Sequence, residues 1–141
     1  MRSFGSGFIF TTALPPALAH GALASVRHLK SSKVERQCQK RQANRLKQLL
    51  HSAGLPILHG DTHIVPVMVN NADTCAQICQ ILLNEHHIYV QPINYPTVPK
   101  QTERLRLTPG PLHTDAMIDD LVEALKRAFD RVKKETALDT G

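Results

Sequence analysis

Residues 88–113, with the sequence IYVQPINYPTVPKQTERLRLTPGPLH, constrain the fold more than any other stretch of the chain. They predict two short strands, residues 88 to about 93 and 104–108, separated by a loop rich in proline. Alternation along the second strand puts its two leucines on one face and its two arginines, Arg104 and Arg106, on the other. One face therefore suits a core, and the other suits solvent or a ligand.

An arginine on the exposed face of a strand, beside a polar loop, is one way to bind an anion. The loop at residues 94–99 reads Asn-Tyr-Pro-Thr-Val-Pro, and it offers an amide, a hydroxyl and a restrained backbone. A guanidinium can hold a carboxylate through two parallel hydrogen bonds. From these residues alone, a carboxylate site and an ordinary surface arginine both remain open.

The chain around this stretch predicts a small α+β domain. The apolar run at residues 64–69 is typical of a strand covered on both faces. A helical stripe follows, and Thr114 is a suitable cap for a last helix. The stripes consist of Cys75, Ile78, Cys79, Leu82 and Leu83 in the first helix and Ile118, Leu121, Val122, Leu125, Phe129 and Val132 in the second. We expect a small sheet that helices cover on one side.

The first part of the chain predicts one long helix that follows a strand or loop at residues 7–12. Pro15 or Pro16 suits the first turn of this helix, and Gly54 suits its end. The stretch from Lys30 to Gln42 is almost entirely polar, which is typical of a helix that bridges two domains. We therefore expect a first domain over residues 1–57 and a small C-terminal α/β domain over residues 58–141.

Charge and cysteine content narrow the class of protein. Residues 1–60 carry a charge balance of +8 and residues 61–141 one of −3, within a formal net charge of +5. The basic residues of the long helix suit either a nucleic-acid surface or a solvated face. The solvated face is favoured because no aromatic residues are interleaved with them.

The 3 cysteines do not form a secreted disulfide framework. Residues 1–24 imitate a secretory leader or a mitochondrial transit peptide. Pro15-Pro16 argues against both predictions, because it interrupts the apolar stretch.

Few catalytic motifs are present. The sequence has no Gly-rich phosphate loop, no G-x-S-x-G, no H-E-x-x-H and no C-x-x-C. We expect no metal site, since Cys75 and Cys79 lie on an apolar helix stripe as buried structural residues do. His63 precedes a strand and His113 follows Pro111-Leu112, so either histidine could face a cleft.

Several stretches together resemble the 5-aminolevulinate synthases, within the α-oxoamine synthase family of pyridoxal-phosphate enzymes. They are GFIFTTALPP, HLKSSKVERQ, AGLP, HIVPVMV and IYVQPINYPTVP…TERLRLTPGPLHT, which run through most of the chain. The resemblance implies the C-terminal part of a fold type I transferase: a strand and a long interdomain helix, then a small sheet covered by helices. It also implies a homodimer that condenses glycine with succinyl-CoA to 5-aminolevulinate, CoA and CO2 in haem biosynthesis.

The resemblance assigns roles to four residues. Arg106 corresponds to the arginine that holds the carboxylate of glycine, and Thr97 to the threonine that helps to recognise the succinyl carboxylate. Thr11, with Thr12 adjacent, corresponds to a residue that reaches the cofactor phosphate of the neighbouring subunit. The Schiff-base lysine of the family is upstream of the matched segments, so we expect no catalytic residue in this chain and no activity from it alone.

Other interpretations stay open at this point. The chain could be a fragment of another α-oxoamine synthase, or a non-catalytic dimerisation or binding module with a basic helix. No nucleic acid or membrane partner is expected. The resemblance implies the cytoplasm for a bacterial source and the mitochondrial matrix for a eukaryotic one.

Overall fold

The computed structural model describes residues 13–139, with side-chain surroundings to residue 137. The chain forms two compact units, residues 1–34 and residues 35–141. We expected the domain boundary after residue 57 instead, because we assigned the whole long helix to the first domain. As a boundary between domains of a complete enzyme, residue 57 stays a prediction.

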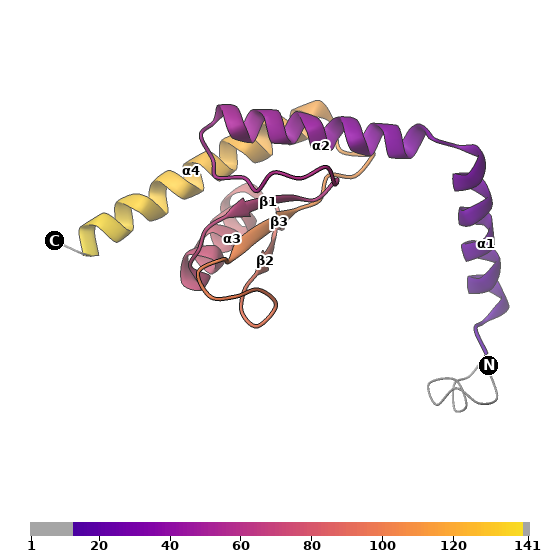
Figure 1. Ribbon diagram of the computed structural model, residues 1–141, viewed down its shortest axis with the longest axis horizontal. Helices are drawn as coiled ribbons and strands as arrows, with labels where there is room; N and C mark the ends of the chain where they lie inside the picture. The colour runs from indigo at the N-terminus through magenta and orange to yellow at the C-terminus, as the bar shows by residue number, and fades with distance from the viewer. Residues whose placement is uncertain (1–12, 140–141) are drawn as a thin grey trace. The chain divides into compact units, whose positions relative to one another are not determined.

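In the first unit, the described residues form helix α1 (Pro16–Ser31), which Pro16 begins (Figure 1). Pro16 suits this place because its missing N–H would have no partner in the first turn. No residue of α1 is buried, and its apolar side chains Leu18, Leu23 and Val26 are exposed. The strand or loop expected at residues 7–12 lies outside the described residues.

The single long helix that we expected is two helices, α1 and α2 (Val34–Ser52). The interruption falls at Ser32, whose backbone is extended with φ −96° and ψ 137°. The Ser31 hydroxyl donates to the carbonyl of His28 at 3.0 Å, and the Ser32 hydroxyl accepts from the N–H of Val34 at 3.3 Å. Neighbouring serines offer the backbone such alternatives to helical hydrogen bonds, which the apolar pattern does not reveal.

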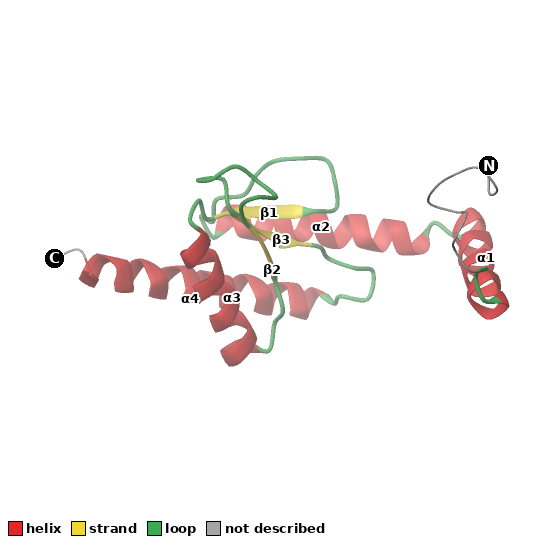
Figure 2. Ribbon diagram, turned by 90° about the horizontal axis from the view of Figure 1, so that it is seen from below, coloured by secondary structure: helices red, strands yellow, loops and turns green. Residues whose placement is uncertain are grey.

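The second unit contains a three-stranded antiparallel sheet in the order β1-β3-β2, and β3 lies between its neighbours (Figures 1 and 2). The strands are β1 (Val65–Met68), β2 (Gln91–Ile93) and β3 (Arg104–Leu107). Helix α3 (Ala72–His86) joins β1 to β2, and helix α4 (Asp115–Asp139) follows β3. Asn71 caps α3, because its side chain accepts from the N–H of Thr74 at 2.9 Å.

The core of this unit lies between one face of the sheet and the helices α2, α3 and α4. Leu105 and Leu107 of β3 are buried while Arg106 is exposed, which confirms the predicted alternation. Further buried side chains come from α2, β1, α3, α4 and the residue before β2, and they include Leu46, Leu50, Val65, Val67, Cys75, Ile78, Leu82, Val90, Ile118, Leu125, Phe129 and Val132. The expected sheet with helices on one side is confirmed.

Burial on β1 alternates, because Val65 and Val67 are buried whereas Pro66 and Met68 are only half-buried. The expectation that both faces of this strand are covered is therefore wrong for the described residues. The apolar run contains a proline and a methionine, and these residues tolerate a half-exposed position. Within residues 13–139, no helix combines the length and the apolarity that crossing a bilayer requires.

Candidate functional site

Arg106 occupies the middle of the central strand β3. Its partners in the register are Pro66 on β1 and Gln91 on β2, so neighbouring strands flank the arginine on both sides. Its side chain is exposed on the face opposite the buried Leu105 and Leu107. Two flanking strands fix the backbone from which the guanidinium extends, so its position depends little on loop conformation.

A cavity of about 330 Å³ lies beside Arg106. Its polar lining consists of Arg106, Thr108, Tyr89, His87 and His113, and no acidic side chain of the described residues lines it. The apolar lining consists of Leu46, Ile88, Val90, Leu107, Pro109, Met117, Ile118 and Leu121. An arginine in a cavity without carboxylates attracts anions, since nothing there neutralises its charge.

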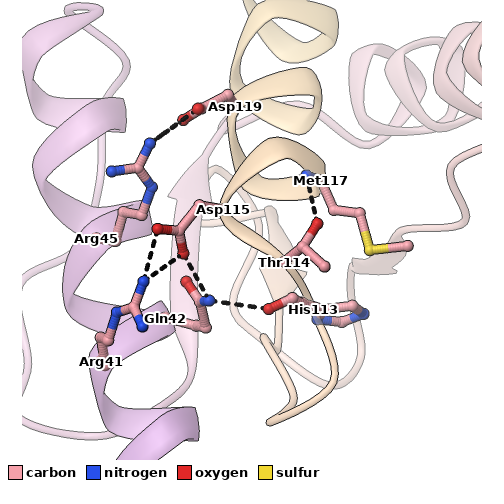
Figure 3. A network of polar contacts seen from close by, with 8 residues as sticks. All are labelled: Arg41, Gln42, Arg45, His113, Thr114, Asp115, Met117 and Asp119. Carbon is pink, nitrogen blue, oxygen red and sulfur yellow. Dashed lines mark hydrogen bonds and ion pairs between the residues drawn. The ribbon is translucent and has the colours of Figure 1, made fainter.

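Two acids close in sequence to this lining, Asp115 and Asp119, form ion pairs with residues outside it, as Figure 3 shows. Asp115 accepts two hydrogen bonds from Arg41, at 2.8 and 2.6 Å, and Asp119 accepts two from Arg45, at 2.6 and 2.8 Å. Both arginines lie on α2 and both aspartates at the beginning of α4. Each aspartate therefore has its counter-charge outside the cavity.

Gln42 connects these ion pairs to the cavity wall. Its side chain is 6% exposed, and its Nε2 donates to Asp115 Oδ1 and to the carbonyl of His113, each at 2.9 Å. The hydrogen bond from Gln42, together with the charge of Arg41, lowers the pKa of Asp115 below its ordinary value. We call these contacts the α2–α4 network: Arg41, Gln42, Arg45, His113, Asp115 and Asp119.

His113 is further held at its ring and at the next residue. Its Nδ1 accepts a hydrogen bond from the N–H of Gly110 at 2.9 Å. Thr114, predicted as the cap of α4, accepts from the N–H of Met117 at 3.2 Å, which confirms the cap (Figure 3). Of the two histidines that could face a cleft, His113 lines the cavity, and His63 is exposed outside that lining.

Thr97 lies outside the lining of the cavity. It is exposed on the loop between β2 and β3, and its N–H donates to the carbonyl of Asn94 at 2.9 Å. The structure therefore brings Arg106 and His113 to one cavity, and Thr97 to a separate loop. Thr11 and Thr12 lie outside the described residues, so their role stays a prediction.

The two cysteines of α3 lie on its apolar stripe. Cys75 is buried on α3 and Cys79 is half-buried, as their place on an apolar stripe predicted. Burial is the main cause that raises the pKa of the Cys75 thiol to about 12, so this thiol stays protonated at neutral pH. Among the residues that the structure describes, no group of three metal-binding side chains occurs.

Sequence reasoning did not identify the α2–α4 network. A signal existed, because Arg41 and Arg45 lie four residues apart on α2, and Asp115 and Asp119 have the same spacing on α4. Residues at that spacing share one face of a helix, so the two pairs are complementary. Gln42 gave no comparable signal, since a lone glutamine in a polar helix resembles a solvated residue.

Comparisons with known proteins agree on one family. Residues 1–125 match the family model described as aminotransferase class I and II. The chain is 60% identical over 131 residues to 5-aminolevulinate synthase of Rhizobium meliloti, covering 93% of this chain and 32% of that protein. It is 46% identical over 134 residues to the human erythroid-specific mitochondrial 5-aminolevulinate synthase, covering 94% of this chain and 23% of that protein.

Solved structures of similar fold are also those of pyridoxal-phosphate enzymes or of related synthases. A serine palmitoyltransferase from S. paucimobilis with bound PLP matches with a TM-score of 0.82 and 28% identity, over 89% of this chain and 32% of that chain. An 8-amino-7-oxononanoate synthase from Francisella tularensis matches with a TM-score of 0.73 and 25% identity, over 95% of this chain and 38% of that one. The chain thus spans about a third of the length of the bacterial relatives it matches.

Proposed function

This chain belongs to the aminotransferase class I and II family, and on that premise we propose that it is the C-terminal part of a 5-aminolevulinate synthase. Such an enzyme condenses glycine with succinyl-CoA to 5-aminolevulinate, CoA and CO2, with pyridoxal phosphate as its cofactor. The similarity to 5-aminolevulinate synthases supports the reaction, and the similarity to a serine palmitoyltransferase with bound PLP supports the cofactor. From the resemblance, we also propose that the complete enzyme is a homodimer.

One observation of the structure carries this proposal: Arg106 extends from the central strand into a cavity without acidic side chains. A carboxylate is the simplest anion that a single guanidinium holds in a fixed orientation, through two parallel hydrogen bonds. We assign to Arg106 the carboxylate of glycine. Holding that group sets the orientation of the amino acid before any bond changes.

The described residues do not by themselves fit the cofactor. The cavity contains an arginine and two histidines but no lysine, and Lys47 donates elsewhere, to the carbonyls of Gly60 and Thr62. Thr11 and Thr12, which we assign to the cofactor phosphate of the neighbouring subunit, lie outside the described residues. The part that we assign to residues 13–139 is therefore binding and orientation of substrate, with Thr97 assigned to the succinyl carboxylate.

A chimaera tests this function directly. The chain would replace the matching C-terminal third of the Rhizobium meliloti relative, and 5-aminolevulinate would be measured with glycine and succinyl-CoA. We expect turnover, and we expect R106Q to lower kcat/KM for glycine by about 100-fold or more, since a charge-assisted hydrogen-bonded pair is lost. The 141-residue chain alone should form no product.

The matched control is T97V in the same chimaera, which should raise the KM for succinyl-CoA and leave the KM for glycine near its starting value. A folded dimeric chimaera that prefers acetyl-CoA or a pimeloyl thioester would favour another α-oxoamine synthase. A folded chimaera without turnover on any of these substrates would contradict the proposed function. Since relatives occur in bacteria and in mitochondria, the compartment follows the source: cytoplasm or mitochondrial matrix.

A further inference from the structure

We propose that His113 is a second residue of the carboxylate site, donating its Nε2–H to the anion that Arg106 holds. This inference rests on the proposed function and adds a ligand to the same cavity. The structure brings the two residues together although different elements carry them: Arg106 lies on β3, and His113 immediately precedes α4.

The tautomer of the ring follows from one hydrogen bond. The N–H of Gly110 donates to Nδ1 of His113 at 2.9 Å, so Nδ1 acts as an acceptor and carries no proton. In the neutral ring, the proton must then be on Nε2. His113 therefore offers a donor at the outer edge of its ring, where a carboxylate oxygen can accept it.

The main chain at His113 is held independently of the ring. The buried Gln42 donates to the carbonyl of His113, and Gln42 also donates to Asp115, which Arg41 holds in turn. Thr114 caps α4 at the next position. Contacts on both sides of His113 leave its ring few alternative orientations, as a binding residue requires.

Within residues 13–139, the Nε2 of His113 has no hydrogen-bond acceptor among the side chains that line the cavity. The polar groups that line the cavity with His113 are Arg106, His87, Thr108 and Tyr89, and the Tyr89 hydroxyl donates to Gln91 Oε1 at 3.0 Å. No carboxylate of the described residues lines the cavity, so neither Arg106 nor His113 has an internal acid there. A carboxylate has two oxygens and about four acceptor positions, enough for a guanidinium and an imidazole together.

Two substitutions separate binding from a merely structural role. In H113N, the amide oxygen takes the place of Nδ1 and can accept from Gly110, but no donor remains at the outer edge. In H113Q, the amide N–H₂ takes the place of Nε2, but the acceptor for Gly110 is lost. If His113 donates to the carboxylate, H113N should bind glycine more weakly than H113Q. If His113 has only a structural role, H113Q should bind more weakly than H113N.

The experiment titrates the isotope-labelled 141-residue chain with glycine, following the Arg106 Nε–H and His113 ring signals by NMR. Acetate serves as a carboxylate without an amine, and methylamine as an amine without a carboxylate. We expect glycine and acetate, but not methylamine, to shift both signals. The Kd for glycine should rise about tenfold in H113N and less than about threefold in H113Q.

The outcomes are distinct. Finding the proton on Nδ1 of His113 in the chain without ligand would overturn the inference. An H113N variant that binds glycine with the same Kd as the unchanged chain would also overturn it. An H113Q variant as weak as H113N also overturns it, while binding by Arg106 stands. If glycine shifts neither signal and R106Q behaves identically, the carboxylate site itself fails, and with it both proposals.

Discussion

The wall of the cavity at His113 and the loop that carries Thr97 are held in opposite ways. The wall depends on the α2–α4 network, which joins residues more than 70 positions apart, such as Gln42 and Asp115. The loop at residues 94–102 is held by hydrogen bonds between neighbours in sequence. Thr97 bonds to Asn94, and Thr102 bonds to Pro99 at 2.7 Å.

This difference matters for the two substrates that we assign to these regions. A site for a small amino acid needs fixed donors, and the α2–α4 network together with β3 supplies them within one unit of the chain. The loop exposes Thr97 and Tyr95, with Lys100 Nζ 5.5 Å from the Tyr95 ring centre. Its local contacts set its own shape, but they leave the Thr97 face open for an acyl substrate.

The largest effect should come from Leu46→Ala, which removes a fully buried side chain on α2 that also lines the cavity. We expect a loss of about 2–5 kcal/mol in the free energy of unfolding, measured by urea denaturation. Tyr95→Ala, at an exposed loop position, should cost about 1 kcal/mol or less. Equal losses of unfolding free energy from the two changes would contradict the difference between the cavity wall and the loop.

A smaller effect is expected from Gln42→Leu, which removes the buried donor to His113 and Asp115. The carbonyl of His113 loses a partner, so the free energy of unfolding should fall by about 1–3 kcal/mol in urea. Thr102→Val removes one side-chain donor from the loop and should cost about 1 kcal/mol or less. If the loop variant proved the more damaging, the loop would be the better-anchored region.

The pH dependence of stability tests the same network. Because the folded-state pKa of Asp115 lies below its ordinary value of 3.8, its contribution is present above that value and is lost as pH falls through the lower folded pKa. Between about pH 4 and about pH 2, the urea midpoint should fall less in Asp115→Asn than in the unchanged chain. Gln42→Leu should reproduce much of this change, since Gln42 is the main cause of the shift. An unchanged slope in Asp115→Asn would argue against the network.

The smallest effect is expected from Thr97→Val in the 141-residue chain. Thr97 is exposed and lies outside the cavity lining, so the free energy of unfolding should change by no more than about 0.5 kcal/mol. The glycine-induced shift of Arg106 should also keep its size. Weaker binding of glycine by this variant would show that loop and wall form a single site.

Local patterns predicted much of the fold. The alternation around Arg106, the stripe of α4 and the Thr114 cap each depend on residues close in sequence, and each is found. The predicted stripe of α3 is found except at Leu83, which is 45% exposed. The break between α1 and α2 was missed because it depends on hydroxyl groups at Ser31 and Ser32, whose hydrogen bonds the apolar pattern does not record.

The site was predictable only in part for a related reason. Arg106 could be placed on an exposed strand face from alternation alone, and its role came from the resemblance. The cavity needs α2, β3 and the beginning of α4 together, so the part of Gln42 follows from packing that no local window contains. His113 could be suspected, but its tautomer depends on Gly110, whose N–H reaches the ring only in the folded turn.

The strand order β1-β3-β2 has a consequence for synthesis on the ribosome. β1 and β2 are not neighbours in the sheet, and each pairs with β3, the last of the three strands to be made; β1 also forms a bridge to Ile57 through Val67. A nascent chain therefore cannot assemble the sheet until Leu107 has emerged from the ribosome, and by then both β1 and β2 have already been made. The strand that completes the sheet is the one that carries Arg106, so the arginine to which we assign the carboxylate is placed in the same step that closes the fold.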